Sequence, residues 1–331
     1  MKKECRDFYR QIQHTYNDIS VREDAVLSSI LLSASNGLIK TSDVPRVAYE
    51  LTQQLENNEI EKSFESLATV KELKKSAKKL SERYEQNKVT TGLLSKVYGE
   101  KEALSDLTLS VKDGEIFGLI GHNGAGKTTT ISILTSIIDA TYGQVYIDDL
   151  LLTEHRDQIK KKIGYVPDSP DIFLNLTAEE YWYFLAKIYD VAPEDIEARI
   201  TKLVDIFELE EQRYNPIESF SHGMRQKVIV IGALLPNPDI WILDEPLTGL
   251  DPQASFDLKE MMKEHAKNGK TVIFSTHVLA VAEQLCDRIG ILKQGKLIFV
   301  GSLGELKMKY PDKDLETIYL ELAGRQASRE G

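Results

Sequence analysis

Apolar side chains in residues 1–88 recur at intervals of three and four positions, the spacing of one face of an α-helix. Only Gly37 and Pro45 bring a glycine or a proline into this stretch. The apolar positions form three stripes: Cys5, Phe8, Ile12, Tyr16 and Ile19; Val44, Val47, Leu51 and Leu55; and Ile60, Phe64, Leu67, Val70, Leu73, Ala77, Leu80 and Tyr84. The pattern predicts a small all-α segment over residues 1–88, whose role the sequence does not indicate.

From about residue 89 the pattern changes to short apolar runs separated by longer helical patterns. Strands that are apolar on both faces and alternate with helices are typical of a parallel sheet covered on each side. The runs lie at 116–120, 240–243 and 272–274, and a hairpin pattern follows at 289–300. We expect an α/β domain over residues 89–309 and a polar, loosely held tail over 310–331.

The run at 116–120 leads into a glycine-rich loop and then into an apolar helical pattern. The loop fits the phosphate-binding pattern G-x-x-x-x-G-K-[ST] in its strand–loop–helix context. Glycines let backbone N–H groups surround a phosphate chain, and the following helix N-terminus adds partial positive charge. Lys127 would reach the β- and γ-phosphates, and the Thr128 hydroxyl would ligate Mg²⁺. The residues expected to hold the nucleotide here are Gly121, Asn123, Gly124, Ala125, Gly126, Lys127, Thr128 and Thr129.

Two further apolar runs end in residues that suit phosphate chemistry. The run at 240–243 delivers Asp244 and Glu245, and the run at 272–274 continues to His277. Open α/β sheets place their ligand chemistry at the carboxyl ends of such strands. Asp244 would hold Mg²⁺, Glu245 would deprotonate the attacking water, and His277 would reach the γ-phosphate. Considered alone, each of these three residues could instead be a structural residue at the end of its strand.

Five motifs in sequence order resemble the ATPase domain of ABC transporters, a P-loop NTPase fold. They are the glycine-rich loop, Ser-His-Gly-Met-Arg-Gln at 221–226, Leu-Asp-Glu-Pro at 243–246, Gly-Leu-Asp at 249–251 and Ser-Thr-His at 275–277. The resemblance covers roughly residues 89–305 and implies a mixed-sheet core with a helical subdomain at about 168–232. It also implies that Tyr98 stacks on adenine, that Ser221 and Gly223 bind the γ-phosphate held by a second subunit, and that Asp251 links the two sites.

The chain departs from the common family pattern at several positions. His222 and Met224 replace the usual glycine and glutamine of the signature motif, and Asp168 stands where a glutamine is usual. Asp168 still offers a hard oxygen to Mg²⁺, so its direct ligation of the metal stays open. These variants resemble the exporter branch whose permeases are separate chains, a group that handles drugs, antimicrobial peptides, lipids and polymers.

Composition narrows the setting in which such a protein works. The 331 residues carry a formal net charge of −11, which disfavours nonspecific nucleic-acid binding. Two cysteines, Cys5 and Cys286, argue against a secreted disulfide framework. No signal peptide and no spanning segment are visible, so if the protein serves a membrane, another chain spans it. The resemblance then implies a cytoplasmic protein that lies peripherally on the inner face of the membrane.

Some features leave alternatives open. Five lysines within residues 71–79 indicate a solvated helix face, or a surface that docks on acidic lipid headgroups or on a permease. Tyr181, Trp182 and Tyr183 would belong either to a groove for a permease helix or to the core of the helical subdomain.

The resemblance implies an ATPase that binds ATP and Mg²⁺, dimerises around two ATP molecules with a second copy or a paralogue, and powers a separate transmembrane permease. The alternatives are a soluble ABC-type ATPase acting on ribosomes or DNA, which the acidic balance and the single phosphate loop disfavour, and a nucleotide-sensing scaffold that does not hydrolyse ATP. Glu245 and His277 argue against the latter.

Overall fold

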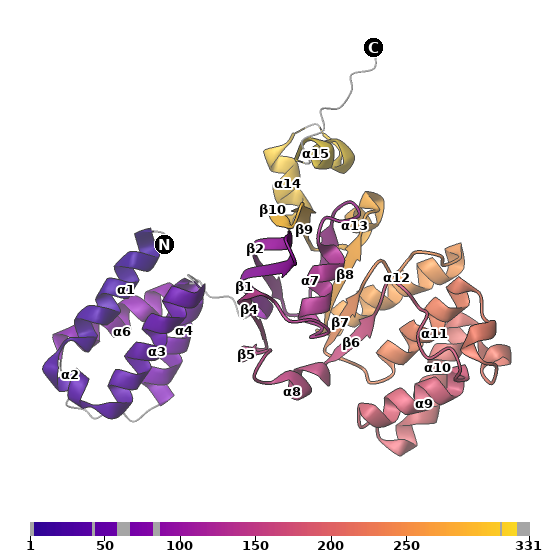
Figure 1. The fold of residues 1–331 in the computed structure, drawn as a ribbon, viewed down its shortest axis with the longest axis horizontal. Helices are drawn as coiled ribbons and strands as arrows, with labels where there is room; N and C mark the ends of the chain where they lie inside the picture. Colours follow the sequence, from indigo (N-terminus) through magenta and orange to yellow (C-terminus); the bar gives the residue numbers. More distant parts are fainter. Residues whose placement is uncertain (1–2, 42–43, 58–66, 82–86, 312, 323–331) are drawn as a thin grey trace, which may run out of the picture. The chain divides into compact units, whose positions relative to one another are not determined.

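The computed structural model describes residues 3–41, 44–57, 67–81, 87–311 and 313–322. These residues divide into two compact units, Met1–Gln86 and Asn87–Gly331. The division lies two residues from the boundary expected between the helical segment and the α/β domain. Figure 1 shows the helices of the first unit and the sheets and helices of the second.

The first unit is a bundle of helices around its own apolar core. Its helices are α1 (Lys3–Tyr16), α2 (Ile19–Glu23), α3 (Ala25–Thr41), α4 (Val44–Asn57) and α6 (Ala68–Ser81). In the four long helices, α3 packs against α1 and α4, and α6 packs against α4 and α1. The buried side chains are largely the stripes expected from the sequence, although Tyr16 is only half-buried and Ile19 is exposed. Ile60, Phe64 and Tyr84 of the third stripe lie outside the described residues.

The second unit is built on two sheets. The six-stranded sheet has the order β10 (Lys296–Ser302), β9 (Arg288–Lys293), β3 (Ile116–Ile120), β8 (Thr271–Thr276), β7 (Ile240–Leu243) and β6 (Ile163–Val166). Its strands are parallel except for β10, which forms the expected hairpin with β9. The second sheet is antiparallel and has the order β2 (Lys101–Lys112), β1 (Asn87–Tyr98), β4 (Tyr142–Ile147) and β5 (Leu150–Leu151).

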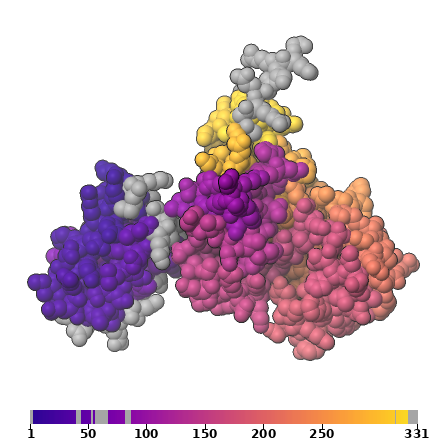
Figure 2. Space-filling model, in the orientation of Figure 1, coloured from indigo at the N-terminus to yellow at the C-terminus, as the bar shows by residue number. Residues whose placement is uncertain are grey.

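Helices cover the six-stranded sheet and extend it at one end. Those beside the sheet are α7 (Lys127–Leu134), α8 (Arg156–Lys160), α12 (Pro252–Lys267) and α13 (Leu279–Leu285). The helical subdomain contains α9 (Ala178–Ile188), α10 (Pro193–Phe207), α11 (His222–Leu234) and the short 3₁₀ turns Glu210–Gln212 and Ile217–Ser219. It forms a salmon-coloured lobe in the space-filling view (Figure 2).

Local sequence explains where the subdomain helices begin. The Thr177 hydroxyl accepts a hydrogen bond from the Glu180 N–H, and the Glu180 carboxylate accepts one from the Thr177 N–H, which is a capping box at the start of α9. Pro193 occupies the first turn of α10, where its missing N–H costs nothing. The Trp182 indole N–H then donates to the Val228 carbonyl at 3.0 Å and ties α9 to α11.

The C-terminal region differs from the loosely held tail that the sequence suggested. After α14 (Leu303–Lys309), residues Leu315–Leu322 form helix α15. Leu315 and Ile318 of this helix are buried in a cluster that includes Ile120 of β3 and Ala282 of α13. The expectation of a loose tail is therefore wrong for residues 315–322, because their apolar spacing packs them onto the sheet.

No helix in the described part of the chain is both long enough and apolar enough to span a lipid bilayer.

Candidate functional site

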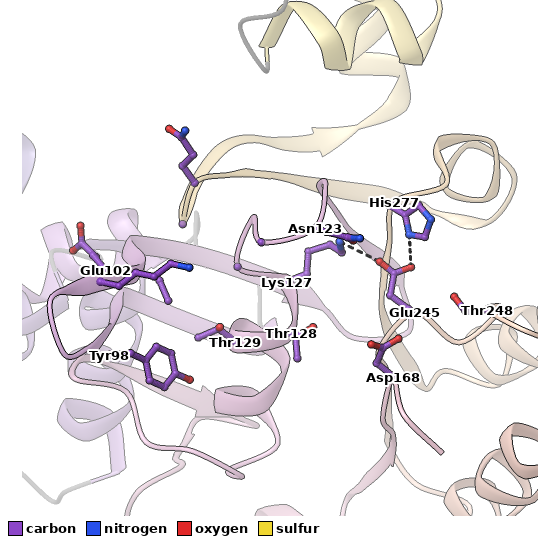
Figure 3. Close-up of a pocket in the computed structure, with 16 residues that line it drawn as sticks. Tyr98, Glu102, Asn123, Lys127, Thr128, Thr129, Asp168, Glu245, Thr248 and His277 are labelled. Atoms are coloured by element: carbon purple, nitrogen blue, oxygen red, sulfur yellow. Dashed lines mark hydrogen bonds and ion pairs between the residues drawn. The ribbon is translucent and has the colours of Figure 1, made fainter. Parts of the chain in front are cut away.

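A hollow of about 660 Å³ lies where the loop between β3 and α7 meets the ends of neighbouring strands (Figure 3). Ten of the residues singled out in the sequence line it: Tyr98, Asn123, Gly124, Gly126, Lys127, Thr128, Thr129, Asp168, Glu245 and His277. Its wall also includes residues that sequence reasoning did not identify: Lys101, Glu102, Ala103, Thr248, Gln294 and Gly295. The folding of the chain thus gathers side chains from six separate segments around one space.

The glycine-rich loop has the backbone conformation that its sequence requires. Gly124 and Gly126 have φ values of 80° and 110°, which residues with a Cβ rarely adopt. The turn between β9 and β10 supports the loop, since the Gly295 N–H donates to the Ala125 carbonyl at 2.9 Å. The Gly295 carbonyl accepts from the Ser105 N–H, also at 2.9 Å, so one turn joins the loop to β2.

Lys127 reaches across the hollow from the first turn of α7. Its ammonium group donates to the Gly121 carbonyl at 2.7 Å and forms an ion pair with the Glu245 carboxylate at 3.1 Å (Figure 3). Only 6% of the Lys127 side chain is exposed, so this positive charge is held in a largely dry environment. A phosphate group entering the hollow would meet a cation that is already desolvated.

Glu245 is oriented by its backbone and by its neighbours. Its φ of 46° lies in the left-handed region, which is uncommon for a residue with a side chain and marks stored backbone strain. One carboxylate oxygen lies 2.9 Å from the His277 Nδ1, and the other contacts Lys127. The Glu245 N–H donates to the Ser275 hydroxyl at 2.9 Å, which fixes the turn after β7 to the end of β8. Ser275 is therefore a positioning residue; it lies in the Ser-Thr-His motif, but the sequence alone assigned it no role.

Asp244 offers a fit for a cation. The residue is fully buried, and its Oδ2 atom has no hydrogen-bond partner. Burial raises the pKa of the Asp244 carboxyl, and the Asp168 and Glu245 carboxylates raise this pKa further, while the Ser275 and Thr128 hydroxyls oppose the shift. A divalent cation would offset this accumulation of negative charge. Because the described residues contain no group of three or more His, Cys, Asp or Glu that could hold a metal, Mg²⁺ would need further oxygens from Thr128, phosphate and water.

Tyr98 stands at the other end of the hollow, at the end of β1. About 49% of its surface is exposed, and the Lys96 ammonium lies 5.1 Å from its ring centroid. Glu102, from the start of β2, lines the same end (Figure 3). An open aromatic face suits stacking against a flat base.

Ser221, Gly223 and Asp251 are predicted site residues that do not line the hollow. Ser221 is the N-cap of α11, where its hydroxyl accepts from the Met224 N–H at 3.3 Å. Gly223 is pressed against the turn before α12, because a Cβ there would lie 2.6 Å from the Gly249 carbonyl oxygen. Asp251 caps α12 and pairs with Lys227 at 3.0 Å, and the hydrogen bond from the Ala254 N–H together with Lys227 lowers the pKa of its carboxyl. The three residues thus lie outside the hollow, where Ser221 and His222 are exposed and the rest of the first turn of α11 is half-buried.

The aromatic residues of α9 lie mainly in the core of the helical subdomain. Tyr181 and Trp182 are buried, and the Tyr183 hydroxyl donates to Glu197 at 2.9 Å. Exposed aromatic surface comes instead from Phe173 and Phe184, whose ring centroids are 5.5 Å apart.

Comparisons with known families divide the chain as the fold does. Residues 104–248 match the family model described as ABC transporter. Residues 3–82 match the model described as bacteriocin immunity protein family. The two matches fall in different units, one in the second and one in the first.

Relatives among characterised proteins are ATP-binding proteins. The linearmycin resistance ATP-binding protein LnrL of Bacillus subtilis (strain 168) is 35% identical over 213 residues, which cover 64% of this chain and 68% of that protein. The ABC-type transporter ATP-binding protein EcsA of the same strain is 36% identical over 236 residues, 70% of this chain and 95% of EcsA. The bacitracin transport ATP-binding protein BcrA of Bacillus licheniformis is 36% identical over 211 residues, 63% of this chain and 68% of BcrA.

Solved structures resemble the second unit. The ATP-binding subunit of an ABC transporter matches with a TM-score of 0.68 and 34% identity, over 71% of this chain and 98% of that one. The dimeric ATP-binding cassette MJ0796, solved with ADP and Pi in a post-hydrolysis state, matches with a TM-score of 0.60 and 30% identity, over 65% and 98% of the two chains.

Proposed function

The chain belongs to the ATP-binding, ATP-hydrolysing subunits of ABC transporters, and from this premise we propose how its residues divide the work and what it helps to export. The observation that most directly supports these residue roles is the arrangement of side chains in the hollow. It brings Lys127 and His277 each within contact distance of Glu245, beside a strained turn.

Within one chain, the loop N–H groups and Lys127 would bind the phosphate chain of ATP, and Tyr98 would stack on the adenine. Entry of the γ-phosphate would draw Lys127 away from Glu245 and free that carboxylate to accept a proton from water. His277 would hold Glu245 from the other side and contact the γ-phosphate. Thr128, Asp244 and Asp168 would hold Mg²⁺, which neutralises developing phosphate charge when it is bound.

We further propose that a second copy, or a paralogous chain, completes each hollow. Ser221 and Gly223 stand at the exposed N-terminus of α11, a position suited to an anion, yet they do not line their own chain's hollow. The homologous MJ0796 cassette was solved as a dimer. Asp251, beside Lys227, would relay the state of one hollow to the other.

The partner in the membrane would be a separate permease, which would place this chain at the inner face of the membrane. We propose that the permease docks on the helical subdomain at the exposed side chains of Phe173, Phe184 and Ile188, which are 47%, 42% and 51% exposed. Apolar side chains at this level of exposure on neighbouring segments are typical of a protein contact.

For the cargo, we propose an antimicrobial peptide or a related toxic compound, which the cell would expel for its own protection. Two of the relatives are named for linearmycin resistance and bacitracin transport. The family matched by the first unit is named for immunity to bacteriocins. These two likenesses lie on separate parts of the chain and favour the same kind of activity.

Hydrolysis can be tested with Glu245→Gln, which keeps the shape of the side chain and removes the base. We expect the Mg²⁺-dependent ATPase rate to fall by at least about 100-fold, while ATP still binds and an ATP-bound dimer accumulates during gel filtration. Glu264→Gln, which removes an exposed carboxylate on α12, should leave both properties unchanged. An unchanged rate in Glu245→Gln would show that another residue is the base.

The cargo proposal has a separate test. Cells that produce this chain together with its partner permease should tolerate higher concentrations of a peptide bacteriocin than cells that produce neither protein. Glu245→Gln should remove this tolerance without lowering the amount of either protein. Tolerance that persists in the variant would show that ATP hydrolysis does not power the protection.

A further inference from the structure

Helix α6 of the first unit carries a concentrated positive charge. Residues 71–79 contain five lysines and one glutamate, whereas the whole chain has a formal net charge of −11. Lys71, Lys75, Lys78 and Lys79 are all exposed. Their spacing places them on one side of the helix, which we call the lysine face. The opposite side holds the buried residues Val70, Leu73 and Ala77, so α6 is already fixed to the bundle through its apolar stripe.

A hollow of about 410 Å³ lies beside the lysine face. Among the described residues, it is lined by Thr52 and Leu55 of α4 and by Lys74, Lys75 and Lys78 of α6. Leu55 supplies an apolar wall, and the lysine methylene groups extend that wall toward their ammonium ends. An anionic group with an adjoining apolar portion would find both kinds of contact here.

The extent of the lysine face favours one class of anionic partner, a membrane surface, over a nucleic acid. The lysine face extends for only about 12 Å along α6, which offers little track to a nucleic-acid strand. A membrane instead presents a dense plane of separate headgroups, each able to meet one ammonium group. We propose that the lysine face docks the first unit on anionic phospholipid headgroups, with the adjoining hollow receiving one headgroup and its glycerol portion.

This proposal concerns the first unit alone and requires neither nucleotide nor permease. It can therefore fail while the function proposed above stands, and the reverse is also true. Each lysine near an anionic surface contributes roughly a fivefold increase in partitioning at low ionic strength. Loss of all four exposed lysines should thus weaken vesicle binding by about 100-fold or more, and salt should weaken it in the same direction.

The experiment is sedimentation of the full chain with two kinds of vesicle, one of phosphatidylcholine alone and one in which a third of the lipid is phosphatidylglycerol. We expect binding to the anionic vesicles only, and loss of that binding in the fourfold variant Lys71→Gln, Lys75→Gln, Lys78→Gln, Lys79→Gln. The same four positions changed to Arg should retain binding. A matched control changes four exposed lysines of the second unit to Gln: Lys160, Lys202, Lys267 and Lys296.

Each outcome decides the question, provided that circular dichroism shows native helix content in every variant. Equal binding to both kinds of vesicle would overturn the proposal, because apolar contact would then dominate. An equal loss of binding in the matched control would also overturn it, because net charge would then explain the effect. Binding to an RNA homopolymer that exceeds binding to the anionic vesicles would assign the lysine face to a different partner.

Discussion

At the scale of single residues, the site depends on polar groups held where water is scarce. The Ser275 hydroxyl donates to Asp244 Oδ1 at 2.5 Å and accepts from the Glu245 N–H at 2.9 Å. One small side chain thus positions both the expected metal ligand and the expected base. Because Ser275 is itself fully buried, water would not easily replace its two hydrogen bonds.

Ser275→Ala should therefore lower kcat for ATP hydrolysis by about tenfold or more while the KM for ATP changes little. The substitution leaves the phosphate loop intact and loosens the Asp244 carboxylate and the turn that carries Glu245. Steady-state kinetics separates the two constants. Ser302→Ala, which removes the cap of α14 far from the chemistry, serves as the control for a general loss of stability. A rise in KM alone would mean that Ser275 acts on nucleotide binding instead.

His265 predicts a pH effect on folding. It is 8% exposed and packs edge-on against Trp241 at 5.7 Å, and burial lowers its pKa from 6.5 to about 4. Between pH 6.5 and about 4, His265 is protonated in the unfolded chain and neutral in the folded chain. The contribution of neutral His265 to the free energy of unfolding is therefore fully present above pH 6.5 and declines as pH falls toward 4. The loss should reach about 3 kcal/mol.

Denaturant unfolding followed by tryptophan fluorescence tests this, because both tryptophans, Trp182 and Trp241, lie in the second unit. In His265→Phe, the difference in unfolding free energy between pH 7 and pH 4 should shrink by about 3 kcal/mol. His14→Gln, which removes an exposed histidine of the first unit, should leave that difference as it is. The same pH dependence in wild type and His265→Phe would assign the effect to other groups.

At the scale of elements, the phosphate loop is supported from outside its own motif. The His122 N–H donates to the Tyr319 hydroxyl of α15 at 2.8 Å. The turn between β9 and β10 holds the loop from another direction through Ala125. The loop therefore has two supports that come from the last quarter of the sequence.

Tyr319→Phe should weaken ATP binding by about three- to tenfold, because the His122 N–H loses the acceptor that fixes the loop. The aromatic ring keeps its packing. Titration of a fluorescent ATP analogue measures the change. Tyr310→Phe, which removes a hydroxyl from the C-terminal end of α14, is the matched control. Equal affinities in both variants and the wild type would mean that α15 supports the fold and has no influence on the nucleotide.

The sequence predicted the elements that local chemistry dictates and missed those that depend on distant contacts. Lys127, Asp244 and Glu245 lie in motifs whose spacing is imposed by phosphate and metal geometry, so the sequence alone could single them out as candidates. Gln294 and Tyr319 reach the site from segments that contain no motif, and only folding brings them there. Helix α15 was missed because eight residues give too short a period to distinguish it from a tail.

At the scale of the whole molecule, the chain consists of two units that each possess a core. Among the residues that the structure describes, the apolar cluster of the first unit runs from Cys5 to Leu80, and the clusters of the second begin at Val89. A unit that buries its own apolar stripe does not need a neighbour to fold. The described residues that line the nucleotide hollow all belong to the second unit.

Removal of residues 1–85 should therefore leave ATP affinity within about twofold of the full chain, and the product should melt as a single cooperative unit. Isothermal titration with ATP and differential scanning calorimetry measure the two properties. A still-folded product without nucleotide affinity would contradict the expectation and would give the first unit a part in binding.

The separation of Ser221 and Gly223 from their own chain's hollow has a consequence for mixtures of intact and damaged copies. If two chains share each reaction, a copy with Lys127→Ala still enters pairs and occupies the place of a working one. Output should then fall with the square of the intact fraction instead of in proportion to it. Such a copy would be dominant-negative in a cell that also makes the normal protein. The loss of output on mixing would therefore measure sensitively how the subunits associate.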